Sequence, residues 1–111
     1  MDIRDLQRQV HALAIEKGWW DDEKPNIPEK LALIHSEISE ALEEYRREPR
    51  DIACHRVGAK GKPEGFPSEL ADTVIRVLDL CEHLGIDLEW HIAQKHAFNC
   101  TRPWRHGNKA C

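Results

Sequence analysis

Four carboxylates lie in two pairs along the chain, and each pair has the spacing of neighbours on one helical face. Glu37 and Glu40 are three residues apart, as are Glu69 and Asp72. Residues i and i+3 of a helix have Cβ atoms about 5–6 Å apart. If the two helices pack side by side, four carboxylates converge, and their mutual repulsion favours a bound cation. Ligands that are all oxygen suit Mg²⁺, with Mn²⁺ as the alternative.

Apolar periodicity predicts the helices that would hold these pairs. Helical spacing of apolar residues extends over four segments, and the carboxylate pairs fall on the second and third of them. No segment alternates in the way that predicts a strand. We therefore expect an all-α fold, a four-helix bundle-like subunit. The four predicted helices are residues 2–17, 28–47, 67–84 and 88–98.

A chain of 111 residues is long enough for one domain, which we expect to span residues 1–111. Residues 48–66 are rich in Gly and Pro and have no sustained period, which predicts a loop between the two carboxylate-bearing helices. Residues 99–111 are basic and contain Pro and Gly, which predicts a non-helical tail. Wide apolar stripes in so short a chain favour oligomerisation.

Charge and composition exclude several classes of protein. The net charge is -4, and acidic residues dominate segments 1–47 and 67–98, so a uniformly basic nucleic-acid-binding domain is not expected. No apolar run approaches the roughly 18 residues of a membrane span. The four cysteines form no CxxC motif and the chain starts without an apolar leader, so we expect reduced thiols and a cytoplasmic location (the host cytoplasm if a phage encodes the protein).

A longer series of residues that includes the four carboxylates resembles a known enzyme family. Glu37-x-x-Glu40 is followed by the segment KPEGFPSELAD at 62–72, which contains Glu69-x-x-Asp72, and then by Lys95-x-x-x-Asn99 and the run RPWRHGNK at 102–109. In this order they are similar to the MazG-like, all-α nucleoside triphosphate pyrophosphohydrolases, most closely to the short single-domain type of bacteria and phages. The resemblance covers residues 26–109.

The resemblance implies Mg²⁺-dependent hydrolysis of a ribo- or deoxyribonucleoside triphosphate to the monophosphate and pyrophosphate. It implies that Glu37, Glu40, Glu69 and Asp72 are metal ligands. Activated water would attack the α-phosphorus, with Glu40, together with Glu37, as the catalytic carboxylates. Lys95 and Asn99 would lie near the phosphates or the sugar of the substrate, and Arg102, His106 and Lys109 would bind its charged groups. The family often has a second Glu directly before the first ligand, where this chain has Ser36.

The segment before the second helix contains candidates for contact with the substrate. Trp19 and Trp20 precede the second helix beside Asn26, and aromatic rings stack on nucleobases. We expect Trp20 and Asn26 to bind substrate, with packing between the first two helices as the alternative for each tryptophan.

Two other classes of function remain open. The chain could be a non-catalytic helical module that binds nucleotides or metal, with Ser36 marking a lost activity. It could also be an interaction protein whose acidic face and basic tail pair with another chain. The expected partners are a small-molecule nucleoside triphosphate and further copies of the chain in a homodimer or homotetramer, with neither a nucleic acid nor a membrane.

Overall fold

Four α-helices make up most of the protein in the computed structural model, which describes residues 2–22 and 24–104. The all-α expectation is therefore confirmed at the level of class. The helices are α1 (Ile3–Glu16), α2 (Ile27–Arg47), α3 (Phe66–His83) and α4 (Leu88–Thr101). Among the described residues, no helix is both long and apolar enough to cross a membrane.

Short polar side chains cap three of these helices at their first residues. The side chain of Asp2 accepts a hydrogen bond from the Asp5 amide, Asn26 from the Glu29 amide and Asp87 from the Trp90 amide. Glycines in the left-handed region follow two of the helices, with φ of +80° at Gly18 and +71° at Gly85.

The structure corrects the expected boundary of the last helix. α4 continues to Thr101, so the prediction that the non-helical tail begins at residue 99 is wrong for residues 99–101. Arg102, with φ of -76° and ψ of 144°, leaves the helix. Pro103 follows it, and a residue before proline is driven toward extended backbone, which is why the helix ends there.

Segment 48–66 also differs from the irregular loop that the sequence predicts. It contains two short antiparallel strands, β1 (Arg56–Val57) and β2 (Pro63–Glu64), joined through a 3₁₀ turn, η1 (Ala59–Gly61). Lys60 has φ of +59° within this turn. Two-residue strands are too short to leave an alternating pattern in the sequence, so this hairpin at 56–64 could not be recognised from periodicity.

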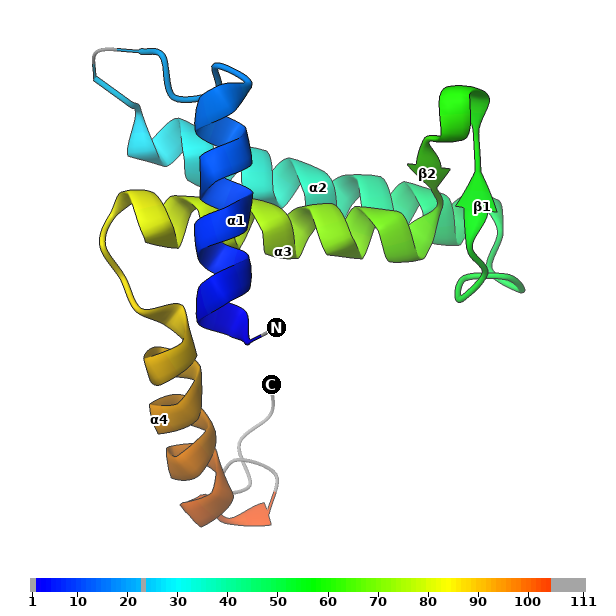
Figure 1. Ribbon diagram of the computed structural model, residues 1–111. Coiled ribbons are helices and arrows are strands. Elements are labelled where there is room, and N and C mark those ends of the chain that lie inside the picture. Colours follow the sequence, from blue (N-terminus) through cyan, green and yellow to red (C-terminus); the bar gives the residue numbers. More distant parts are fainter. Residues whose placement is uncertain (1, 23, 105–111) are drawn as a thin grey trace.

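The helices are arranged around one antiparallel pair. α2 and α3 lie side by side, α1 crosses over α3, and the hairpin lies at the end where α2 finishes and α3 begins (Figure 1). α4 projects from the other end and has no buried residue among those described. Within the described residues the chain therefore does not form a four-helix bundle on its own.

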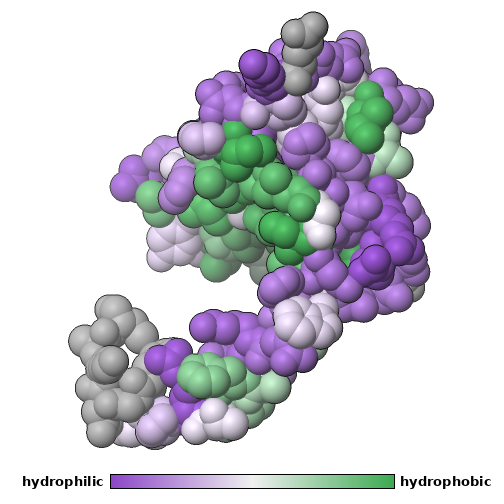
Figure 2. Space-filling view, turned by 90° about the vertical axis from the view of Figure 1, so that its left-hand side faces the viewer, coloured by the Kyte–Doolittle hydropathy of each residue, from purple (hydrophilic) through white to green (hydrophobic). Residues whose placement is uncertain are grey.

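The apolar core of the described residues is small. Its buried members are Ala14, Ala41, Leu78, Leu80 and Cys81. Larger apolar side chains of α2 and α3 are about half exposed. Figure 2 shows a large hydrophobic patch on the body of the molecule, above the projecting arm, and smaller hydrophobic areas elsewhere. The exposed side chains of this kind include Leu31, Ile38, Leu42, Leu70 and Val74.

Candidate metal centre

Three of the predicted carboxylates meet between α2 and α3. One oxygen each of Glu37, Glu40 and Glu69 lies within 4.8 Å of the others. Glu37 is buried, Glu69 in the first turn of α3 is half-buried, and Glu40 is exposed. The antiparallel packing of the two helices places the middle of α2 beside the start of α3, which explains why residues far apart in sequence converge.

Asp72, the fourth predicted ligand, lies one turn farther along α3 at the edge of the same site. It is not among the three oxygens that fall within 4.8 Å of one another. All four carboxylates line one open cavity of about 320 Å³, together with Glu44, Arg47 and the hairpin residues 62–64. The structure thus places the four together, with Asp72 peripheral.

Two carboxylate oxygens of this cluster are buried without a hydrogen-bond partner among the described residues. Glu37 Oε1 accepts a hydrogen bond from Arg76 Nε at 2.7 Å, but Glu37 Oε2 is buried and unpartnered. Glu69 Oε2 is in the same condition. An unpaired buried carboxylate oxygen is costly because the desolvation of the charge is not compensated. The residues present therefore fit Mg²⁺ or Mn²⁺, whose preferred ligands are oxygens.

Burial, together with the mutual repulsion of these groups, changes how two of them bind protons. Burial, a hydrogen bond with Glu40 and the charges of its neighbours raise the pKa of Glu69 from 4.5 to about 7. Burial and the charge of Glu37 raise the pKa of Asp72, although Arg76 and Lys62 oppose this shift. Without a cation Glu69 thus keeps its proton up to near neutral pH, and a bound cation would favour its ionised form.

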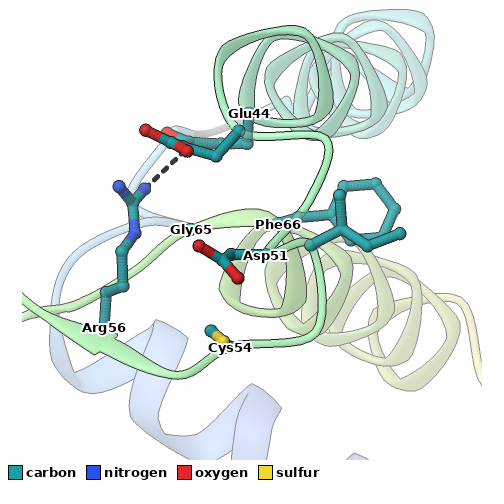
Figure 3. Close-up of a pocket in the computed structure, with 8 residues that line it drawn as sticks. Glu44, Asp51, Cys54, Arg56, Gly65 and Phe66 are labelled. Carbon is teal, nitrogen blue, oxygen red and sulfur yellow. Dashed lines mark hydrogen bonds and ion pairs between the residues drawn. The ribbon is translucent and has the colours of Figure 1, made fainter.

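Glu44 connects the carboxylate cavity to the hairpin. Figure 3 shows Glu44 of α2 and Arg56 of β1 pointing toward one another across a neighbouring pocket of about 240 Å³, which Asp51 and Cys54 also line. Arg56 Nη2 donates to Glu44 Oε2 at 2.6 Å. Since Glu44 lines both spaces, this ion pair fixes the hairpin beside the carboxylates.

A second cavity lies beyond Arg76, on the side of the two tryptophans. It measures about 340 Å³ and is lined by both tryptophans, Lys30, Arg76 and Asp79, among others. Trp19 and Arg76 also line a smaller space that includes Glu37 and Asp72. The second cavity is therefore adjacent to the carboxylate cluster.

Trp20 is half-buried and packs mainly against α3, whereas the alternative considered from the sequence was packing between the first two helices. Its Nε1 donates to both carboxylate oxygens of Asp79, at 2.9 and 3.0 Å. Its ring stacks on His83 with centroids 3.9 Å apart, and the Lys30 ammonium lies 4.4 Å from the ring centroid. The Trp20 ring is thus held by contacts with His83, Asp79 and Lys30. Trp19, 51% exposed, is the more accessible ring in this cavity.

Of the other predicted substrate contacts, the four that lie in the described part of the chain do not line the carboxylate cavity. Asn26 is exposed and its side-chain oxygen caps α2. Lys95 and Asn99 are exposed on α4, which leads away from the cluster (Figure 1), and Arg102 follows that helix. The Lys95 ammonium lies 5.6 Å from the Phe98 ring centroid. His106 and Lys109 lie outside the described residues.

Arg76 was not among the expected site residues, yet it bears on the cluster, as does Lys62 of segment 48–66. Arg76 could have been found from spacing, since Glu69, Asp72, Arg76 and Asp79 follow one another at helical intervals on an otherwise apolar segment. That pattern predicts a single polar face. The place of Lys62 depends on the hairpin, which the sequence pattern did not indicate.

No protein family model, no curated protein and no solved structure matches this chain. The likeness to the MazG-like enzymes therefore rests on the residue series quoted above.

Proposed function

We propose that the protein is a Mg²⁺-dependent nucleoside triphosphate pyrophosphohydrolase. The observation that carries this proposal is the state of Glu37. Arg76 holds one of its oxygens, and the other is buried and unpartnered beside Glu40 and Glu69. A structural ion pair alone would not require two further carboxylates so close, whereas a cation bound by all three explains their proximity.

In the proposed reaction, water attacks the α-phosphorus and the bond to the leaving pyrophosphate breaks. Mg²⁺ held by the carboxylates would supply Lewis-acid activation of the phosphate and of the water. Glu40 is the exposed member of the trio, so it can orient the water and accept its proton. Glu37 is buried and held by Arg76, which suits a fixed ligand better than a proton acceptor.

The second cavity is the proposed place for the base. It adjoins the carboxylates through Arg76 and Trp19, so a nucleotide with its phosphates at the cluster can extend its base toward Trp19. Aromatic rings stack on bases without strong base preference. This assignment replaces Trp20 by Trp19 as the stacking residue.

We also propose a homodimer or homotetramer, because the described core is small and the apolar side chains of α2 and α3 are half exposed. Two copies that share this surface would complete a helical bundle that the described residues of one copy do not form. The same assembly would give the exposed Lys95, Asn99 and Arg102 a route to the carboxylates of another copy.

A nucleotide panel tests the proposed reaction. We expect wild-type protein with Mg²⁺ to convert at least one of the common or modified nucleoside triphosphates to the monophosphate and pyrophosphate, both quantified by chromatography. Glu40→Gln should lower turnover by about a hundredfold or more while the helical circular dichroism is unchanged. Glu43→Gln, an exposed neighbour that pairs with Arg46, is the matched control and should retain activity.

Other outcomes would favour the alternatives. Release of orthophosphate in place of pyrophosphate contradicts the attack at the α-phosphorus. Binding of metal and nucleotide without turnover of any substrate supports the non-catalytic module, for which Ser36 in place of a second Glu is the sequence argument. If Mg²⁺ does not change the stability of the protein, the result contradicts both the pyrophosphohydrolase and the metal-binding module. The interaction protein is then the reading that is left.

A further inference from the structure

Lys62 extends from the hairpin into the wall of the carboxylate cavity. Its backbone is fixed on both sides, because its amide donates to the Ala59 carbonyl at 3.2 Å and its carbonyl accepts from the Gly58 amide at 2.7 Å. Gly61, with φ of +76°, turns the chain directly before it. The hairpin thus fixes the backbone of Lys62 beside the carboxylates.

Lys62 is the cation of this cavity that has no partner in the part of the chain that the structure describes. The cavity wall has one other basic side chain, Arg47, and its Nη1 lies 3.7 Å from Glu44 Oε1. Among the described residues, none forms a hydrogen bond or an ion pair with the Lys62 ammonium, although its charge acts on Asp72. An unpaired ammonium opposite a carboxylate cluster is available to an anionic ligand.

The cavity therefore has two chemically different sides. The carboxylates of α2 and α3, and Glu64 of the hairpin, repel phosphate unless a divalent cation offsets their charge, whereas Lys62 attracts phosphate directly. A monophosphate has one phosphoryl group for both the cation at the carboxylates and the Lys62 ammonium. A chain of several phosphates can contact the cation with one group and Lys62 with another.

We propose that Lys62 binds the distal phosphates of a polyphosphate ligand, so that the site selects triphosphates over monophosphates. This inference rests on the proposed function, in which the distal phosphates leave as pyrophosphate. There Lys62 would offset the negative charge that develops on the leaving group as the bond to the α-phosphorus breaks. It acts on the phosphates and leaves the choice of base to the other cavity.

The direct test uses inorganic tripolyphosphate as the probe, titrated calorimetrically into protein saturated with Mg²⁺. We expect Lys62→Met to weaken tripolyphosphate binding by roughly tenfold or more, the loss expected for one charge-assisted hydrogen bond. Inorganic phosphate should bind both proteins within about twofold, because it does not span the cavity. Lys62→Arg should retain most of the tripolyphosphate affinity.

Lys60→Met is the matched control. Lys60 lies in the same turn, is exposed and does not line the cavity, so its loss should leave tripolyphosphate binding unchanged. Binding of Mn²⁺ alone, followed by electron paramagnetic resonance, should be the same in Lys62→Met as in the wild type or slightly tighter. A lysine that only neutralises Asp72 would alter metal binding and leave tripolyphosphate binding intact, and that result overturns the proposal.

The outcomes separate this inference from the proposed reaction. Tripolyphosphate binding that depends on Lys62, in a protein that hydrolyses no nucleotide, supports the phosphate contact and overturns the reaction. Hydrolysis with an unchanged KM in Lys62→Met, together with unchanged tripolyphosphate binding, supports the reaction and overturns the phosphate contact.

Discussion

Glu37 and Arg76 illustrate how one ion pair can prepare a carboxylate for a metal. The Glu37 residue is 8% exposed, and burying an ionised carboxylate is unfavourable unless its oxygens are matched. Arg76 Nε satisfies Oε1 and fixes the carboxylate plane, which leaves Oε2 beside Glu40 and Glu69. Glu37 Oε1 thus has a structural partner in Arg76, and Oε2 is the proposed metal ligand.

Glu69 makes the stability of the metal-free protein depend on pH. Its pKa is about 7 in the folded protein against an ordinary 4.5, so the folded state binds this proton more tightly than the unfolded state. The associated stabilisation is complete below the unfolded pKa and is lost as pH rises through the folded pKa. Asp72 acts in the same direction, because its pKa is also raised.

We therefore expect the metal-free wild type to lose stability relative to Glu69→Gln between about pH 5 and pH 8. Urea unfolding in EDTA at several pH values measures the difference. Added Mg²⁺ should restore stability at the upper end of this range in the wild type and much less in Glu69→Gln. Glu16→Gln, at an exposed position on α1, should follow the wild type at every pH. Parallel pH profiles for wild type and Glu69→Gln would refute the expected shift.

At the scale of elements, a polar cluster joins α1 to α3. Asp79 is buried on α3, and its Oδ1 lies 2.7 Å from His11 Nδ1 of α1. Trp20, just after α1, donates to the same carboxylate and stacks on His83 of α3. This cluster stabilises the crossing of the two helices.

Substitution of the two tryptophans distinguishes packing from base binding. Trp20→Phe keeps a ring but removes the hydrogen bond to Asp79, so the free energy of unfolding should fall by about 1–3 kcal/mol while KM for the best nucleotide is unchanged. Trp19→Ala, at a half-exposed ring, should raise KM with little loss of stability. Thermal unfolding and steady-state kinetics provide the two measurements. The reverse pattern would show that Trp20 contacts the base.

At the scale of the whole molecule, the exposed apolar surface determines the expected assembly. Val74 on α3 is 54% exposed, and Val57 on the hairpin is 61% exposed. We expect light scattering to give the mass of a dimer or tetramer for the wild type, and Val74→Glu to shift it toward the monomer because a charge in an apolar interface is not solvated. Val57→Glu is the control of similar exposure. A wild-type monomer with full activity would contradict the assembly.

The helices and the pairing of carboxylates were predictable because both depend on local spacing. Three helices are capped by the side chains of Asp2, Asn26 and Asp87, each of which accepts a hydrogen bond from an amide three residues ahead. Such contacts depend on neighbouring residues in the sequence. The hairpin and the direction of α4 were not predictable, because they depend on contacts between segments far apart in the chain.

By itself, the sequence determined the helical class, most helix boundaries and the i, i+3 spacing that places two carboxylates on one face of each helix. Only the tertiary structure decided which oxygens of those carboxylates are left without a partner. The rotation of α3 against α2 brings Arg76 to one oxygen of Glu37 and leaves the other buried beside Glu40 and Glu69. Lys62 reaches the same cavity only through the fold of the hairpin. Local spacing depends on the geometry of one helix, whereas the partners of a buried charge depend on how two helices pack.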